Sequence, residues 1–197
     1  MTIWTGVSVV AKPTGELIAP AKLKARLRID HPDDDALLTD LLAGAVSLID
    51  GPNGIGYAMM RQTWRLSLDC FPFRITLPGA PVKSVVSIRY LDADGVEQTL
   101  AQENYRVDVD REPARVEPAY GLAWPATRHV SGAVKVDYLV GEEAAADVVP
   151  ALIDAVCMIV AHRHANREAV ALDKQAIEMP MGAAQILREF MRCRVTA

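Results

Sequence analysis

The stretch Gln62-Thr63-Trp64-Arg65-Leu66-Ser67-Leu68-Asp69-Cys70 marks the point where the hydrophobic pattern of this 197-residue chain changes. From here apolar side chains alternate with polar ones, which is the pattern of a half-buried β-strand. Further strands are predicted in FRITL (73–77), SVVSIRYL (84–91), NYRVDV (104–109), ARVEP (114–118) and AVKVDYLV (133–140). Because turn residues rather than long helical crossovers separate these runs, residues 62–141 are predicted to form a small antiparallel β-sheet.

Two helices are predicted before this sheet, within residues 17–61. In APAKLKARLRID (19–30) basic and apolar residues alternate, which would also fit a strand. Ala, Lys, Leu and Arg favour a helix, however, and Pro20 suits a first helical turn. The second helix is predicted to begin at Asp33-Asp34-Asp35, which supplies an N-cap and negative charge at the positive end of the helix dipole. Apolar residues at helical spacing follow, and Gly51-Pro52 ends the run.

Helix is predicted again after the sheet, as a core helix over residues 147–170. Pro150 lies in its first turn, and the apolar residues up to Val160 leave little polar surface. A long helix that is apolar on nearly all sides belongs in a core or between subunits. The fold class is therefore α+β. We predict a single domain over residues 1–197: a small bundle of the N-terminal helices and this long apolar C-terminal helix, with the antiparallel sheet inserted.

A last amphipathic segment, residues 179–197, follows the break at Pro180 and Gly182. It either folds back on its own core or reaches out as an arm. We favour a C-terminal arm, because adaptable Met-rich surfaces suit the grooves of partner proteins. The candidate partner-binding residues are Met181, Ile186, Leu187, Phe190, Met191 and Arg194.

No pattern in the sequence predicts catalysis, a metal site or a cofactor. The glycines of residues 51–59 follow a helix and precede a strand, the reverse of a dinucleotide-binding turn. His162 and His164 point to different faces of a helix, and the better-spaced pair of His164 and Glu168 has no third ligand nearby. Cys157 lies in the most apolar run, which is typical of an inert core thiol. No serine has the context of a hydrolase nucleophile.

Composition indicates a protein that is made in the cytoplasm. Cys70, Cys157 and Cys193 are an odd number without paired spacing, which is typical of reduced thiols. No segment approaches the roughly 20 apolar residues of a membrane span. The start of the sequence, MTIWTGVSVVAKPTGE, lacks the basic and apolar regions of a secretory signal.

Charge is unevenly distributed along the chain, whose formal net charge is −4. Residues 92–117 hold eight acids against three arginines, and such a surface would repel phosphates. Tight nucleic-acid binding is therefore not expected. The candidates for an acidic surface facing a channel are Asp92, Asp94, Glu97, Asp108 and Asp110.

The first helix carries a basic face, and its residues are the candidates for a subunit interface: Lys22, Lys24, Arg26 and Arg28. Two interpretations stay open. The face is either a solvated helix surface or a docking surface for an acidic neighbour, such as residues 92–117 of another copy.

The order of these segments, from about residue 17 to 195, resembles the head–tail connector, or adaptor, proteins of long-tailed phages and gene-transfer agents. The matching stretches are LKARLRID (23–30), DDDALLTDLLAGAVSLID (33–50), QTW (62–64), LPGAPVKSVVSIRYLDADGVEQTL (77–100), NYRVD (104–108), WPATR (124–128), AVKVDYLVG (133–141), DVVPALIDAVCMIVAHRHANREAV (147–170) and MPMGAAQILREF (179–190). One departure is that Glu189 and Phe190 stand where many relatives have a proline.

This resemblance implies a structural protein without catalysis, incorporated in the neck of a virion or of a gene-transfer-agent particle. Relatives form a ring, usually of twelve copies, beneath the portal protein. The ring extends the DNA channel toward the stopper or tail protein, and DNA passes through without specific binding. In relatives the C-terminal segment makes the contact on the portal side, which matches the arm predicted over residues 179–197.

The physical interpretation agrees with this function. DNA must traverse a neck channel quickly, so an acidic or neutral bore is useful. A closed ring uses two complementary patches per subunit, which can be weak singly when a template and ring closure supply avidity. We therefore expect the free protein to be monomeric or weakly associated. The alternatives are another neck component, such as a mainly β stopper or tail-completion protein, and a general protein-binding module, which would form a stable dimer.

Overall fold

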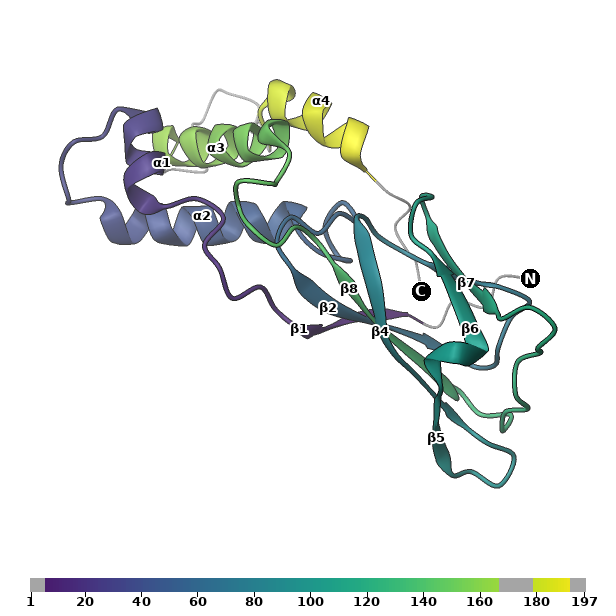
Figure 1. Ribbon diagram of the computed structural model, residues 1–197. Helices are drawn as coiled ribbons and strands as arrows, with labels where there is room; N and C mark the ends of the chain where they lie inside the picture. Colours follow the sequence, from purple (N-terminus) through teal and green to yellow (C-terminus); the bar gives the residue numbers. More distant parts are fainter. Residues whose placement is uncertain (1–5, 167–178, 192–197) are drawn as a thin grey trace.

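The structure is a computed structural model that describes residues 6–166 and 179–191. It is an α+β protein with a layer of helices at one end and two antiparallel β-sheets at the other (Figure 1). The helices are α1 (Pro20–Leu27), α2 (Asp35–Ile49), α3 (Pro150–Ala165) and α4 (Met181–Phe190). None of the helices in these residues is long and apolar enough to cross a membrane.

The β region consists of two sheets rather than the one predicted. The larger has the order β1-β2-β8-β4-β5, and the smaller has the order β3-β7-β6. Their strands are β1 (Val7–Ala11), β2 (Gln62–Leu68), β3 (Ile75–Leu77), β4 (Val82–Leu91), β5 (Glu97–Leu100), β6 (Tyr105–Asp108), β7 (Ala114–Pro118) and β8 (Val134–Val140), with a short 3-10 helix, η1 (Gln102–Asn104), before β6. Strand positions follow local alternation, but pairing joins distant segments that such alternation does not identify.

Strand β1 is a feature that the sequence did not predict. It pairs with β2 at the edge of the larger sheet, with Val9 opposite Trp64. Four of its five residues are exposed. An edge strand that buries so little apolar surface leaves only a weak pattern in the sequence.

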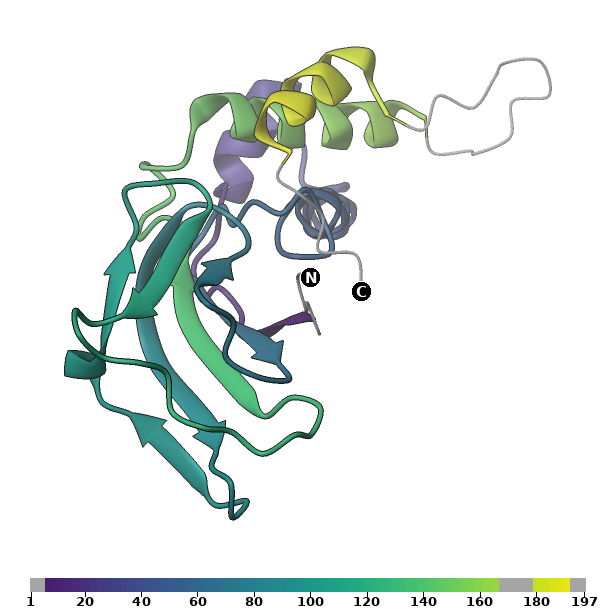
Figure 2. The same cartoon turned by 90° about the vertical axis from the view of Figure 1, so that its right-hand side faces the viewer.

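The two sheets enclose one hydrophobic cluster and the helices another. Alternate residues of β2, among them Trp64 and Leu66, pack inside the β region with Val116 of β7 and Val136 of β8. The larger sheet curves around the smaller one (Figure 2). The helical cluster joins Leu23 of α1, Ile49 of α2, Leu152 of α3 and Leu187 of α4, and it includes Met59 and Met60 of the connection into β2.

The structure does not support the long apolar helix predicted over residues 147–170, because the described helix α3 is shorter and polar at its end. The helix has 16 residues, Pro150–Ala165, and ends in the polar turn of His162, Arg163 and His164. Its buried side packs on α2 and α4, whereas Met158 is 40% exposed and Asp154 forms a surface ion pair. Residues 167–170 lie outside the described part of the chain.

Helix α4 does not form an arm in this structure. It lies against α3 (Figure 2), where Ala183 and Leu187 are buried. The Phe190 ring meets Tyr57 edge-on, with 5.9 Å between the ring centroids. The same amphipathic pattern that suits a partner groove is here satisfied by the chain's own α3. Residues 192–197 of the predicted arm, and with them Arg194, lie outside the described residues.

The predicted starts of helices α1 and α2 agree with the structure, but one capping interaction differs. Helix α1 begins at Pro20 and ends at Leu27, and its C-cap residue Arg28 adopts the left-handed conformation with φ 58°. Asp34 occupies the N-cap position of α2, yet its side chain makes no capping hydrogen bond. Its carboxylate instead lies 2.9 Å from Nε2 of His164, so it connects the start of α2 to the end of α3.

Candidate assembly surfaces

The junction between the helices and the larger sheet is made by a buried chain of hydrogen bonds. Asp50 at the end of α2 accepts hydrogen bonds from the Met59 backbone N–H at 2.7 Å and from Gln62 Nε2 at 2.9 Å. The carbonyl oxygen of the same Gln62 side chain accepts a hydrogen bond from Trp64 Nε1 at 2.8 Å. Gln62 is only 3% exposed and Trp64 only 1%. The Gln62-Thr63-Trp64 start of β2 therefore anchors the sheet to the helices.

The Trp64 ring packs directly against the backbone of Gly79, where no larger residue fits. Gly79 has φ 86°, and a Cβ atom at this position would overlap the six-membered part of the indole. Both the left-handed backbone and the close approach therefore favour glycine there. The Tyr138 ring packs edge-on against Trp64, with 6.3 Å between the ring centroids. Its hydroxyl donates a hydrogen bond to the Pro78 carbonyl.

In the described part of the chain, the Asp50 carboxylate has only neutral hydrogen-bond donors. Burial raises the pKa of Asp50 above its usual value, and the hydrogen bonds from Met59, Gln62 and Gly51 offset part of that rise. No ion pair joins it to any lysine, arginine or histidine among residues 6–166 and 179–191. It is therefore a partly buried negative charge without a cationic partner in that part of the chain.

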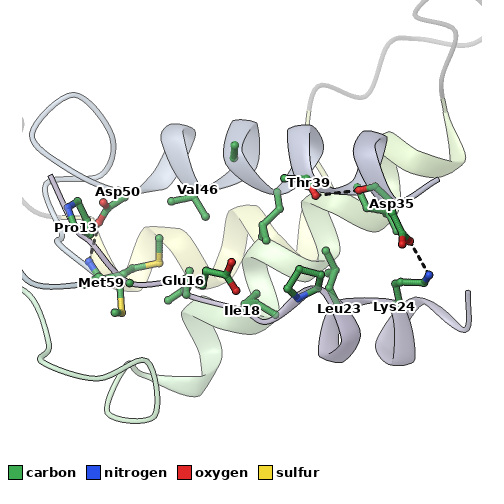
Figure 3. A pocket seen from close by; sticks show the side chains of 17 residues that line it. Pro13, Glu16, Ile18, Leu23, Lys24, Asp35, Thr39, Val46, Asp50 and Met59 are labelled. Atoms are coloured by element: carbon green, nitrogen blue, oxygen red, sulfur yellow. Dashed lines mark hydrogen bonds and ion pairs between the residues drawn. The ribbon is translucent and has the colours of Figure 1, made fainter. Parts of the chain in front are cut away.

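An apolar groove of about 510 Å³ leads to this carboxylate (Figure 3). One wall is a continuous face of α2, and the opposite wall is the segment of residues 13–24 that enters and forms α1. Met59 and Met60 close one end next to Asp50. The lining residues from α2 are Asp35, Leu38, Thr39, Leu42, Ala43, Val46 and Asp50. Because Asp35 and Asp50 are fifteen residues apart, this face is roughly 22 Å long.

The basic residues predicted as a subunit interface are partly engaged within the chain. Lys24 Nζ lies 2.6 Å from the Asp35 carboxylate and donates a hydrogen bond to the His31 carbonyl. Arg26 Nη1 lies 2.6 Å from Asp154 of α3, and this contact raises the pKa of Arg26.

The remaining two basic residues of this helix, Lys22 and Arg28, are exposed. Of the four side chains, Lys24 and Arg26 thus form ion pairs with other described residues. Two of them hold α1 against its neighbours, a role that neither interpretation from the sequence included.

Some acidic residues of the segment 92–117 likewise form contacts within the chain. The Asp92 carboxylate accepts hydrogen bonds from Gln98, Val96 and Asp94, and these lower the pKa of Asp92. Glu97 lies between Arg89 at 3.0 Å and Lys135 at 3.6 Å.

The other three acidic candidates lie on loops or strand ends. Asp94 and Asp110 are exposed, and Asp108 is half-buried at the end of β6. The structure thus brings Asp92, Asp94 and Glu97 together around the turn between β4 and β5, and it places Asp108 and Asp110 in the separate hairpin of β6 and β7.

The outer face of the larger sheet carries a charged cluster that sequence analysis missed. Asp137 of β8 is 8% exposed and accepts two hydrogen bonds from Arg65, at 2.6 and 2.9 Å, and one from Arg89 at 3.2 Å. Burial alone would raise the pKa of Asp137, but the two guanidinium groups outweigh it, and the pKa lies below its usual value. The three residues come from neighbouring strands, so only strand pairing reveals the cluster.

A cluster of exposed aromatic and aliphatic side chains lies at the opposite end from the helices. Phe73 is 85% exposed, Tyr120 is fully exposed and Leu122 is 51% exposed. They come from the loop after β2 and the loop after β7, and they surround a shallow hollow. We call Phe73, Tyr120 and Leu122 the aromatic tip. Sequence analysis missed it, because exposure within loops has no periodic signal.

Side chains behind the aromatic tip hold its two loops together. Phe71 and Trp124 stack with 4.8 Å between ring centroids, and Trp124 Nε1 donates to the Phe73 carbonyl at 3.4 Å. Arg74 lies over the Phe73 ring and 3.2 Å from Glu117. An exposed apolar surface on a braced support is typical of an interaction site.

The predicted partner-binding residues of the C-terminal segment fall into two groups. Leu187 is 4% exposed, and Ile186 and Phe190 are half-buried against the helical core, so their apolar surface is largely used within the chain. Met181 is 87% exposed and Met191 is 54% exposed. Only these two present substantial apolar surface for a partner in this conformation.

The described residues contain no cluster of three or more His, Cys, Asp or Glu side chains that could hold a metal ion. His162 and His164 lie in the last turn of α3, where His164 pairs with Asp34 and His162 lies 3.3 Å from the Asn166 amide. Cys157 is buried beneath Arg26, whose guanidinium is 3.5 Å from its sulfur.

Comparison with solved structures finds chains of similar fold in gene transfer agent particles. A chain in the virion of a native gene transfer agent particle is 26% identical, with a TM-score of 0.75 over 97% of both chains. A chain in the neck of an empty particle, determined with C6 symmetry, is 26% identical, with a TM-score of 0.75 over 98% of both. A chain in the neck of a native particle, determined with C12 symmetry, is 25% identical, with a TM-score of 0.64 over 95% of this chain and 98% of that one.

No protein-family model matches the sequence, and no curated protein is significantly similar to it. The solved structures are therefore the comparison that relates this chain to known proteins. They show that its fold is similar, over nearly the full length, to that of a chain in the neck of a gene transfer agent particle.

Proposed function

We propose that the chain is a structural subunit of the neck of a gene-transfer-agent or phage-like particle, where it acts as the adaptor between portal and tail. The observation that carries the proposal is the similarity to a chain in the neck of an empty gene transfer agent particle over 98% of both chains, with a TM-score of 0.75. A match that leaves almost nothing of either chain uncovered concerns the whole architecture and not one shared motif. The role is structural, without catalysis or a cofactor.

In this proposal the subunit assembles as a closed ring, with twelve copies as the expected number. The neck structures of the similar chains were determined with C12 and C6 symmetry, which supports a cyclic arrangement. A cyclic ring requires two different surfaces on each subunit that fit one another. The described residues offer several exposed apolar and charged surfaces for such contacts.

The portal is proposed to meet the helical end of the subunit, and the stopper or tail protein is the other axial partner. Met181 and Met191 present exposed apolar surface beside α3 and α4. DNA is proposed to pass through the ring without specific contacts. This is supported by the mixture of acids and arginines on the β region, since a strongly basic bore would hold phosphates.

Electron microscopy of particles purified from the producing cells tests the proposal, with the density of the neck traced against this chain. We expect a ring of this chain directly beneath the portal. If the chain were missing from the particle, or were located at the tail tip, the adaptor function would be excluded. A ring located one level lower, in contact with the tail, would identify a stopper or tail-completion protein instead.

A further inference from the structure

The apolar groove contains an unbalanced charge that indicates what it binds. Its wall includes the Asp50 carboxylate, whose hydrogen-bond donors are all neutral, and the exposed Glu16 lies on the opposite side. Among residues 6–166 and 179–191, Lys24 is the only cation that lines it, and it is paired with Asp35. A partly buried carboxylate gains most from a cation that enters on an apolar stem, because both groups are then shielded from water. The groove therefore fits an apolar element that carries one basic side chain.

The aromatic tip has this chemistry. Phe73, Tyr120 and Leu122 supply apolar surface, and Arg74 lies directly over the Phe73 ring, 5.3 Å from its centroid. The pair that Arg74 makes with Glu117 is solvent-exposed, with side chains 42% and 48% accessible. Exposed pairs of this kind contribute little, so Arg74 can exchange this partner for a shielded carboxylate. The tip is also braced in advance, which reduces the entropy lost on docking.

The residues that line the groove belong to α1, α2 and the segments next to them, whereas the tip lies on the loops after β2 and β7, at the end of the β region away from the helices (Figure 1). A contact between them must therefore join two copies. We propose that the aromatic tip of one subunit docks in the groove between α2 and residues 13–24 of the next, with Arg74 directed to Asp50. Such a contact uses two different surfaces and repeats head to tail, which is the arrangement that closes rings.

This inference rests on the proposed function, and photo-crosslinking in purified particles tests it. Tyr120 is replaced by the photoreactive amino acid p-benzoylphenylalanine, which is also aromatic and suits a fully exposed site. After irradiation we expect crosslinks to peptides of residues 13–24 or 35–50 of another copy. The same substitution at Val86, exposed on β4, is the control and should not label the groove. Labelling of a portal or tail protein from position 120, or the absence of any crosslink between copies, would overturn the proposal.

A matched pair of variants tests the groove itself. Ala43→Glu places a charged side chain in the groove, and Ser47→Glu places the same side chain on an exposed position of α2 outside it. We expect Ala43→Glu to reduce the Tyr120 crosslink at least tenfold and Ser47→Glu to leave it unchanged, with similar melting temperatures. An equal yield in both variants would exclude the groove as the docking site. If the wild-type chain were absent from the neck, the proposed function itself would have failed, which is a distinguishable result.

Discussion

At the scale of single residues, two buried polar arrangements hold the β region in place. Gln62 uses both ends of its amide, donating to Asp50 and accepting from Trp64. Asp137 holds two arginines from the strands on either side of β8. In both cases the loss of one partner leaves others buried without hydrogen bonds, which costs more than the bond itself contributes.

Gln62→Leu should lower the free energy of unfolding by about 2–4 kcal/mol, because Asp50 and the Trp64 indole would each lose a partner while buried. In a chain of this size each kcal/mol lowers the melting temperature by roughly 2–4 °C. Thermal unfolding followed by circular dichroism measures the change. Gln102→Leu, on an exposed position of η1, is the control and should shift the midpoint by less than about 1 °C.

Asp137→Asn should lower stability by about 1–3 kcal/mol at pH 7, since Arg65 and Arg89 would lose their counter-charge. The pKa of Asp137 is lower in the folded state than in the unfolded state, so its contribution is complete above the unfolded value of about 4. It is lost as the pH falls through the folded pKa. Urea unfolding at pH 7 and near pH 2.5 should show the difference between wild type and variant shrinking, whereas a constant difference would contradict the ion-pair explanation.

At the scale of elements, helix α4 is the part whose position bears most on assembly. Its contacts are mainly with α3, and Gly182 faces Met158 across this interface. Two buried side chains, Ala183 and Leu187, fix a helix of only ten residues. A short helix attached by so few buried groups belongs to the less stable parts of a fold.

Leu187→Ala should loosen this attachment. We expect amide hydrogen exchange in α4 to accelerate by tenfold or more while exchange in β2 and β8 changes little, because the helix can detach locally. Hydrogen exchange read by mass spectrometry gives both values in one experiment. Arg188→Ala, an exposed neighbour, is the control. Equal acceleration in the strands would mean that α4 and the sheet unfold together.

Met181→Glu tests whether the exposed apolar end of α4 meets the portal. The side chain is 87% exposed, so the variant should melt within about 1 °C of the wild type. Binding to purified portal, measured by biolayer interferometry, should weaken at least tenfold. Gln185→Glu adds the same charge to the same helix at an exposed position and should retain affinity. Unchanged binding by both variants would move the portal contact elsewhere.

At the scale of the whole molecule, the surface consists of small separate patches, some charged and some apolar. Lys24 and Arg26 of α1 and Glu97 of the β region are ion-paired within the chain, and separate apolar sites such as Met181 and the aromatic tip are exposed. Patches of this size give weak contacts singly and become effective when many copies assemble together.

The free protein should therefore sediment mainly as a monomer at micromolar concentration in analytical ultracentrifugation. Addition of portal rings should convert it to a complex of uniform stoichiometry. A ring that formed alone at the same concentration would contradict the requirement for a template.

The sequence predicted the α+β class, helices α1 and α2, and strands β2, β3, β4, β6, β7 and β8. It missed β5 (Glu97–Leu100), because three of the four residues of this strand are exposed. Strand β1 likewise has no clear period of burial, since its exposed side chains pack on little. The direction in which α4 folds could not be predicted, because an amphipathic helix pattern does not identify the surface that covers it. The cluster around Asp137 and the aromatic tip depend on pairing between distant segments, so sequence alone could not locate them.

The pairing of Gln62 with Val140 places the two ends of the long β excursion side by side. The segment from β2 to β8 thus leaves the helices and returns to them at two adjacent strand ends. Among the described residues, β1 is the only strand of the larger sheet outside this segment. Domains can be inserted or exchanged where entry and exit are adjacent, because the host does not have to stretch. Evolution could therefore remodel the far loops, and with them the choice of neighbour, without redesigning the helices. A grafting experiment could do the same.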